Sequence, residues 1–263
     1  MWEEDQGPKT PFAAAIGRFV AARQSLAEAL AAARANEFVV GRVNVVGSDV
    51  ENAAELLDTI HDQARDAYAA MYAESEDDPV TKVLRDPKYV HGSDDALAEA
   101  WQAAINSESA EARLARIKRS FRLTFRPTRR LATAYKAFFF FVRAYQDVMY
   151  CLLNNSSSGS MGSAFKNEHN PIRVYLDDHL PSYVAWFSEF RRLRNKIKDG
   201  FGAALSSMGS PRGSGSLGLI VTQPPTAVSV YHLSDAATAL DFSSQLTEVT
   251  AETVRSRAAE VRT

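Results

Sequence analysis

The sequence of 263 residues has a single cysteine, Cys151, and this scarcity excludes several kinds of protein. One cysteine cannot form an intrachain disulfide or a cysteine metal cluster. Cys151 lies in an apolar helical run, which favours a buried packing role over a reactive one. The acidic first five residues have no signal-peptide pattern, so a reducing cytoplasm is the expected location.

Uninterrupted apolar runs and glycine fingerprints are also missing. The longest apolar stretch, residues 131–153, is interrupted by Lys136, Arg143 and Asp147. Charged side chains are costly in a bilayer, so this stretch predicts a buried core helix and no membrane partner. The Gly/Ser-rich segment at 213–218 matches neither the phosphate-loop nor the dinucleotide-binding pattern. No His and Glu spacing typical of a zinc helix occurs, so neither a metal nor a cofactor is expected.

Apolar residues spaced three and four apart occur through most of the chain, and they predict amphipathic helices. The longest stripe keeps this alternation through residues 131–152, and the phenylalanines at 139–141 widen it. The middle of this helix is therefore apolar nearly all round, which is typical of the centre of a bundle. We expect a mainly α protein that forms a helical bundle.

Two segments suggest β-structure. The β-branched residues at 37–47 predict a short strand or a packed connector, followed by a helix whose capping box is Ser48 and Glu51. Two β-like runs on either side of residues 223–226 predict one small β-hairpin near residues 217–232.

The net charge of −2 hides a strong asymmetry along the chain. Residues 1–108 contain 9 Lys/Arg and 20 Asp/Glu, whereas residues 109–200 contain 17 and 7. The chain thus divides into an acidic helical N-terminal region, 1–108, and a helical region, 109–263, that carries the hairpin and the C-terminal helix. The two form separate units or one continuous domain. The acidic stretch at 74–79 predicts a solvated loop, and the asymmetry predicts either a polyanion-binding face or docking of one half on the other.

Residues 113–130 form a basic run without any acidic residue. Apolar residues interleave at helical steps, so the run predicts an amphipathic helix that Pro127 breaks or kinks. The interleaved residues are Leu114, Ile117, Phe121 and Phe125. The run either packs against the acidic half or contacts the phosphates of RNA or another polyanion, with a membrane-surface helix as a third alternative. Its candidate RNA-binding residues are Arg119, Arg122 and Arg126.

The helix predicted to begin at Pro181 carries a second basic cluster. Arg191, Arg194 and Lys198 are spaced i, i+3 and i+7, so they share one line along the helix. The cluster overlaps a short motif, Arg194-Asn195-Lys196-Ile197-Lys198-Asp199-Gly200. This motif resembles the signature helix of the HEPN family, Arg-Asn-x-x-Lys-His-Gly, with Asp199 in the place of the His. The resemblance covers roughly residues 128–205.

The resemblance implies a small helical bundle, a homodimer and metal-independent endoribonuclease chemistry. It places Arg194, Asn195, Lys198 and Asp199 at the catalytic motif positions, and Arg191, Arg194 and Lys198 on a face that binds RNA. Arg194 is suited to stabilise charge on a phosphate. Asp199 is a weak base at neutral pH, and its charge repels phosphate. We therefore expect a HEPN-like protein that is catalytically impaired and binds RNA or a protein partner.

The alternative is an active ribonuclease of the toxin or defence type that uses a substitute acid or base. His169 and His179 lie ahead of the motif helix and are the candidates for that role. The pair Arg143 and Asp147 also resembles a polar patch on the corresponding family helix, and a local i, i+4 ion pair explains it equally well.

Overall fold

The structure, a computed structural model, describes residues 11–73, 78–90, 93–198, 203–206, 218–223 and 227–261. In chain order the helices are α1 (Pro11–Ala32), α2 (Glu37–Ala73), α3 (Pro79–Arg85), α4 (Pro87–Val90), α5 (Asp94–Ser107), α6 (Ala110–Leu153), α7 (Met161–Ala164), α8 (Pro171–His179), α9 (Pro181–Lys198) and α10 (Leu233–Glu260). The strands are β1 (Ala203–Ser206), β2 (Gly218–Gln223) and β3 (Ala227–His232).

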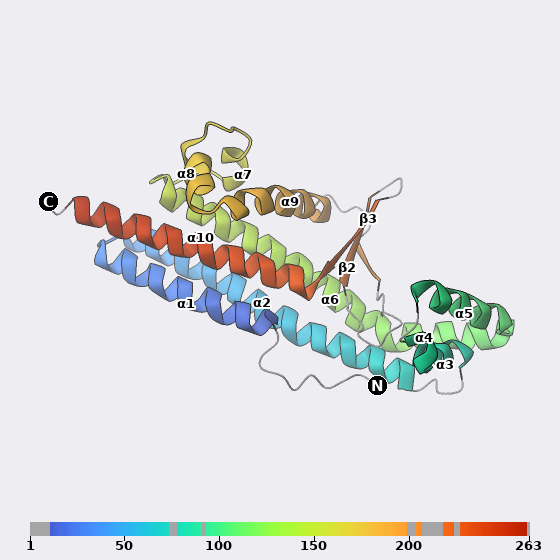
Figure 1. The fold of residues 1–263 in the computed structure, drawn as a ribbon. Coiled ribbons are helices and arrows are strands. Elements are labelled where there is room, and N and C mark those ends of the chain that lie inside the picture. Colours follow the sequence, from blue (N-terminus) through green and yellow to red (C-terminus); the bar gives the residue numbers. More distant parts are fainter. Residues whose placement is uncertain are drawn as a thin grey trace.

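The long helices α1, α2, α6 and α10 lie side by side and form an elongated bundle (Figure 1). α2 packs along α6, α1 packs along α10, and α6 also contacts α10. A hydrophobic core extends from Phe12 in α1 to Ala251 in α10. The expected mainly α bundle is confirmed, and its core contains residues from both sides of position 108.

The second half of α6 lies in the middle of this core, as its apolar stripe predicts. Phe138 is fully buried, and its ring packs edge-on against Phe12 of α1 with centroids 5.9 Å apart. Tyr145 packs edge-on against Phe19 of α1, and its hydroxyl forms a 2.9 Å hydrogen bond with the hydroxyl of Thr247 in α10. α6 therefore joins helices that are far apart in the sequence.

Small residues contribute to the packing of α1 and α10. Ala15, Ala22 and Ala29 recur every seven residues on α1, and all are buried. α10 buries Ser243 and Thr247, whose hydroxyls donate hydrogen bonds to backbone carbonyls four residues earlier. Because these two hydroxyls are satisfied within their own helix, burying them leaves neither one unpaired.

Residues 37–47 form the first turns of α2, so the predicted strand or connector is wrong. α2 is continuous, and its buried residues are spaced as a helix requires. The capping box is also wrong, because Ser48 and Glu51 lie inside α2, where both instead bind Arg23 of α1. Arg23 lies 2.5 Å from Oε2 of Glu51 and 3.1 Å from Oγ of Ser48. A Cβ at Gly47 would overlap the Arg23 guanidinium, so this glycine makes room for a contact between helices.

β2 and β3 pair antiparallel, with Gly218 opposite His232 and Gln223 opposite Ala227, as the predicted hairpin requires. β1, which the sequence analysis did not predict, pairs antiparallel with the other edge of β2. β1 contacts α6, and β2 contacts both α6 and α9. The small sheet is therefore next to the C-terminal end of the motif helix α9.

Pro127 lies inside α6 without ending it, so the predicted break does not occur. Proline removes one backbone hydrogen bond and crowds the preceding turn. The flanking segments are held by other contacts, since the bundle core begins at Leu131 and ion pairs fix the turns around Arg116. In the described part of the chain, neither α6 nor any other helix is long and apolar enough to cross a bilayer.

We predict that Phe138→Ala lowers the free energy of unfolding by about 3–5 kcal/mol, because it empties an enclosed aromatic site. Phe140 on the same helix is 56 % exposed, so Phe140→Ala is a matched control. We expect the control to cost about 0.5 kcal/mol or less. Guanidinium titration measures both values, and similar losses for the two variants would show that Phe138 has no special place in the core.

Candidate nucleic-acid interface

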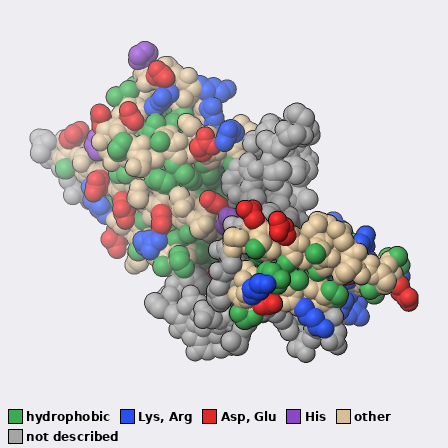
Figure 2. All heavy atoms as spheres, turned by 45° about the vertical axis from the view of Figure 1, so that its right-hand side comes forward, with side chains coloured by type: hydrophobic (Ala, Val, Ile, Leu, Met, Phe, Trp, Pro, Cys, Tyr) green, Lys and Arg blue, Asp and Glu red, His purple; other side chains and the backbone are tan. Residues whose placement is uncertain are grey.

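The first half of α6 projects beyond α1 and α10 toward α3, α4 and α5 (Figure 1). Its arginines pair with acidic residues at the start of α3 and the end of α5. We call α3, α4, α5 and residues 110–130 of α6 the arm. The apolar stripe of the basic run lies on this part of α6 and is exposed to solvent. Its exposed members are Leu114, Ile117, Phe121 and Phe125. Figure 2, in which the arm comes forward, shows hydrophobic side chains beside Lys and Arg side chains on this part of the molecule. Such a contiguous exposed apolar surface is typical of an interaction site.

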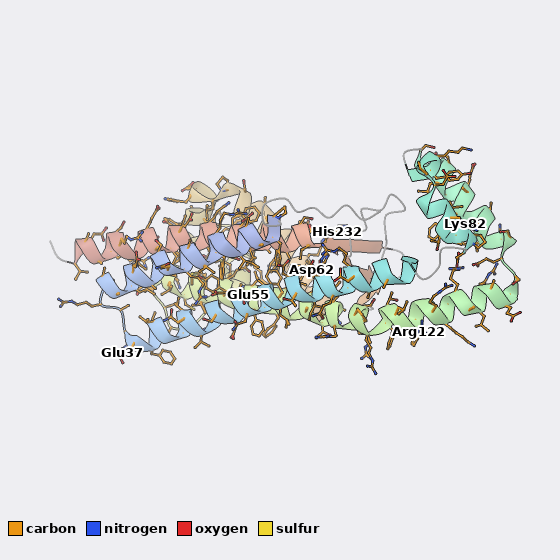
Figure 3. The ribbon with its side chains drawn as sticks, turned by 90° about the horizontal axis from the view of Figure 1, so that it is seen from below. Glu37, Glu55, Asp62, Lys82, Arg122 and His232 are labelled. Atoms are coloured by element: carbon orange, nitrogen blue, oxygen red, sulfur yellow. The ribbon has the colours of Figure 1, made fainter. Side chains whose placement is uncertain are left out.

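A row of exposed cations runs beside this stripe. Lys118, Arg122 and Arg126 recur every four residues, so they lie on one line along α6. Each is the residue immediately after an apolar member of the stripe. Lys118 and Arg126 have no ion pair with any residue that the structure describes. Figure 3 shows Arg122 on α6, at the end of the molecule opposite Glu37.

The aromatic members of the stripe stack on each other at the surface. The rings of Phe121 and Phe125 have centroids 4.4 Å apart and an interplanar angle of 25°. Phe121 is 60 % exposed and Phe125 is 39 % exposed. The guanidinium of Arg129 lies 5.6 Å from the centre of the Phe125 ring. Exposed aromatic rings beside cations are the combination that single-stranded nucleic acids bind, since bases stack on rings and phosphates contact cations.

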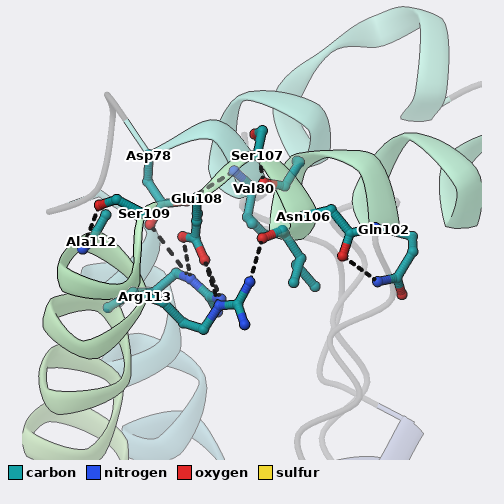
Figure 4. A network of polar contacts seen from close by, with 12 residues as sticks. Asp78, Val80, Gln102, Asn106, Ser107, Glu108, Ser109, Ala112 and Arg113 are labelled. Carbon is teal, nitrogen blue, oxygen red and sulfur yellow. Dashed lines mark hydrogen bonds and ion pairs between the residues drawn. The ribbon is translucent and has the colours of Figure 1, made fainter.

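Other arginines of the basic run hold the arm together. Glu108, at the end of α5, accepts two hydrogen bonds of 2.8 Å from Arg116, and Arg113 lies 3.9 Å from the same carboxylate (Figure 4). Asp78 caps α3 and also lies 3.7 Å from Arg119. The side chains of both acidic residues are almost fully enclosed. Arg119, predicted to bind RNA, therefore has a carboxylate partner within the protein.

The solvated loop predicted at 74–79 is wrong for Asp78, the described residue of that stretch that precedes Pro79. Its Oδ1 accepts hydrogen bonds from the backbone N–H groups of Val80 and Thr81. The sequence contains a signal for this role, since Asp followed by Pro is typical of a helix N-cap and its first residue. The contact with Arg119, in contrast, is visible only in the folded chain.

The HEPN-like motif lies at the C-terminal end of α9. Arg194, Asn195 and Lys198 belong to the last turns of this helix, and Asn195 is exposed. The side chains of Arg194 and Lys198, and the whole of Asp199, lie outside the part of the chain that the structure describes. The backbone therefore places motif residues 194–198 at the C-terminal end of α9, beside the small sheet.

Aromatic and charged contacts fix α9 on α6. Phe190 packs edge-on against Phe139, with centroids 5.9 Å apart. The guanidinium of Arg143 lies 5.4 Å from the centre of the Phe187 ring and 2.6 Å from Asp147. The local ion pair considered for Arg143 and Asp147 is thus present, and it also carries a contact between helices.

The same polar network attaches α7. Asp147 accepts a 2.8 Å hydrogen bond from the backbone N–H of Met161, and Arg191 donates a 3.2 Å bond to the carbonyl of Gly162. A Cβ at Gly162 would lie 2.8 Å from Nη2 of Arg143, so the glycine leaves space for that guanidinium. Arg191, a candidate RNA-binding residue, is therefore engaged in holding α7 against α9.

The candidate substitute histidines lie ahead of α9. His179 ends α8, where its ring stacks on Tyr175 with centroids 4.1 Å apart. Arg194 is thirteen residues beyond Pro181, and a helical rise of 1.5 Å per residue separates the two by about 20 Å. Within one chain, His179 is thus too far from Arg194 to act on the same phosphate. His169 is exposed in the loop before α8.

No group of three or more His, Cys, Asp or Glu side chains in the described ranges is arranged to hold a metal ion. Comparisons with protein-family models, with curated proteins and with solved structures found no match.

The ionisation of Glu108 should make the stability of the arm depend on pH. The hydrogen bonds from Arg116 lower the pKa of the Glu108 carboxyl below its ordinary value. A carboxyl with a lowered pKa stabilises the folded arm above its unfolded pKa of about 4.3, and this contribution is lost as the pH falls through the lower folded pKa. We therefore expect Glu108→Gln to increase hydrogen exchange of α5 amides at neutral pH, with a difference from wild type that shrinks below about pH 4.

Glu99→Gln is the matched control, because Glu99 is an exposed carboxylate on the same helix. Comparing the variants with wild type at each pH cancels the intrinsic pH dependence of amide exchange. Equal exchange in wild type and Glu108→Gln at neutral pH would contradict the structural role of this carboxylate.

Proposed function

We propose that this chain is a HEPN-like helical protein with an impaired catalytic motif, and that it binds single-stranded RNA through the exposed face of its arm. The observation that carries the proposal is the exposed stack of Phe121 and Phe125 beside the cation row of Lys118, Arg122 and Arg126. The rings would receive bases, and the cations would contact phosphates.

The spacing of the cations supports this mode of binding. Residues four apart on a helix are separated by about 6 Å along its axis, so the row presents successive positive charges to one strand. Lys118 and Arg126 have no carboxylate partner among the described residues, so phosphate contacts by these two side chains need not break an internal ion pair. Release of counterions from the phosphates would make such binding strongly dependent on salt.

The family part of the proposal comes from the motif in residues 194–200. The packing of Phe190 on Phe139, which joins the motif helix to the central helix, supports it. Asp199 in place of the motif His supports the impairment, because an ionised carboxylate can neither donate a proton nor attract a phosphate. The same resemblance implies a homodimer, which light scattering would reveal as twice the chain mass.

We predict that the full chain binds single-stranded oligouridine in fluorescence anisotropy at low salt. The double variant Phe121→Ala, Phe125→Ala should bind at least tenfold more weakly, since base stacking on one aromatic ring contributes about 1–3 kcal/mol. Phe140→Ala removes an exposed phenylalanine from the bundle part of the same helix and should bind like wild type.

Salt dependence provides a second measurement of the same interface. Arg126→Gln should reduce the slope of log affinity against log salt by about 0.7 if Arg126 contacts one phosphate of a single strand. Arg18→Gln, an exposed arginine paired with Asp241 on the bundle, is the control and should leave the slope unchanged. Absence of RNA binding, or equal binding by the double phenylalanine variant, would contradict the proposal and favour a protein partner for the exposed stripe.

For the motif, we predict little or no metal-free RNA cleavage by the wild-type chain. Asp199→His would restore the spacing Arg194-x-x-x-x-His, and general acid–base catalysis typically contributes about 10²–10⁴ in rate. Cleavage should therefore appear in Asp199→His and disappear when Arg194→Ala is added. Gel analysis of labelled RNA in the presence of a chelator measures each step.

Robust metal-free cleavage by the wild type that Arg194→Ala abolishes would overturn the impaired reading and support the active ribonuclease. His169→Ala and His179→Ala would then identify the substitute acid or base. His179 would have to reach Arg194 from a second chain, because about 20 Å of α9 separate Pro181, two residues after His179, from Arg194.

A further inference from the structure

At the end of the bundle opposite the arm, the ends of α1, α6 and α10 and the start of α2 surround a cavity of about 860 Å³. Glu37, labelled in Figure 3, marks this end of the molecule. Leu30, Val39, Val148 and Val254 contribute apolar wall. The volume and the largely apolar walls are those of pockets that bind small molecules. No part of the proposed RNA interface lies here.

The charged residues that line this cavity are of one sign. Arg34 follows α1, Arg42 belongs to α2, and Arg257 belongs to α10, so three separate segments bring an arginine to the same place. None of the described residues that line the cavity is Asp or Glu. An apolar pocket with clustered cations and without carboxylates is complementary to a ligand with an apolar body and an anionic head.

The end of α6 would by itself disfavour an anion, because its last carbonyls carry partial negative charge. Arg257 removes this obstacle by donating hydrogen bonds of 3.0 and 2.7 Å to the carbonyls of Leu152 and Leu153. Arg34 and Arg42 are exposed, and no carboxylate in the described ranges pairs with either. Arg42 donates a 3.4 Å hydrogen bond to the backbone carbonyl of Ser157, a neutral partner, so Arg34 and Arg42 are the guanidinium groups positioned to meet an anionic head group.

We propose that this cavity binds a small amphipathic anion, such as a medium-chain carboxylate or alkyl phosphate. The alkyl chain would lie along the apolar walls, and the head group would accept charge-assisted hydrogen bonds from Arg34 and Arg42. Phe38 and Val261, both exposed at the cavity, extend the apolar surface that an alkyl chain contacts. Burial of that chain supplies affinity, and the arginines supply selectivity for the negative head.

The test is calorimetric titration of the full chain with decanoate below its micelle concentration, with decanol as the uncharged analogue and decyl phosphate as the second head group. We expect saturable one-site binding of at least one of the two anions. Decanol should bind the wild type about tenfold more weakly than the anions do. Either anion should bind the double variant Arg34→Gln, Arg42→Gln about tenfold more weakly than it binds the wild type. Arg65→Gln, an exposed arginine elsewhere on α2, should bind like wild type.

A pair of neighbouring positions on α10 locates the binding. Ala258 lines the cavity, whereas Ala259 is exposed and does not, so Ala258→Trp should block binding and Ala259→Trp should preserve it. Circular dichroism would show whether both variants fold. Val39→Trp on α2 is a second blocking variant if Ala258→Trp does not fold.

Cys151 offers an independent readout, because the chain's single cysteine lines the same cavity. Saturating anion should slow alkylation of Cys151 in the wild type and leave it unchanged in the double arginine variant. Equal affinity for decanol and the anions, binding retained in both blocking variants, or absence of saturable binding would overturn the proposal. If light scattering showed that the ligand doubles the mass, this end of the bundle would instead be an interface between two chains.

Discussion

The burial of the aromatic half of α6 is the constraint on which the rest of the structure depends. The rings of Phe138 and Tyr145 pack against aromatic rings of α1. Tyr145 also forms a hydrogen bond with Thr247 of α10, and Phe139 packs against Phe190 of α9. With 44 residues, α6 spans about 66 Å, which is about twice the 33 Å of the 22-residue α1. The first half of α6 therefore extends beyond α1 and contacts the short helices of the arm.

Outside the bundle, ion pairs add to the few buried apolar residues of the arm, Val80, Leu97 and Ala104. Glu108 and Asp78 join α5 and α3 to α6 through arginines, in side-chain environments that exclude most water. These ion pairs use one side of the basic run and leave Lys118 and Arg126 facing solvent. Of the two alternatives considered for the charge asymmetry, docking of part of the basic run on acidic residues is present in the structure, and polyanion binding by the other part is the proposal.

The polar residues around the HEPN-like motif divide in a similar way. Arg143 of α6 contacts Phe187 of α9, and Asp147 of α6 and Arg191 of α9 both bind the backbone of α7, so these residues position α9. The motif positions themselves lie further along α9, beyond this network.

The periodicity of the chain was enough to predict the bundle, the central place of residues 131–153 and the paired strands near 217–232, because apolar spacing directly reflects which face is buried. It could not predict α2 correctly, since Ser48 and Glu51 satisfy a local capping rule but are bound by Arg23 from another helix. Nor could it separate Arg116 and Arg119, which meet carboxylates, from Arg126, which does not. Local rules depend on neighbours along the chain, whereas ion pairing, exposure of a stripe and convergence of arginines on a cavity depend on neighbours in space.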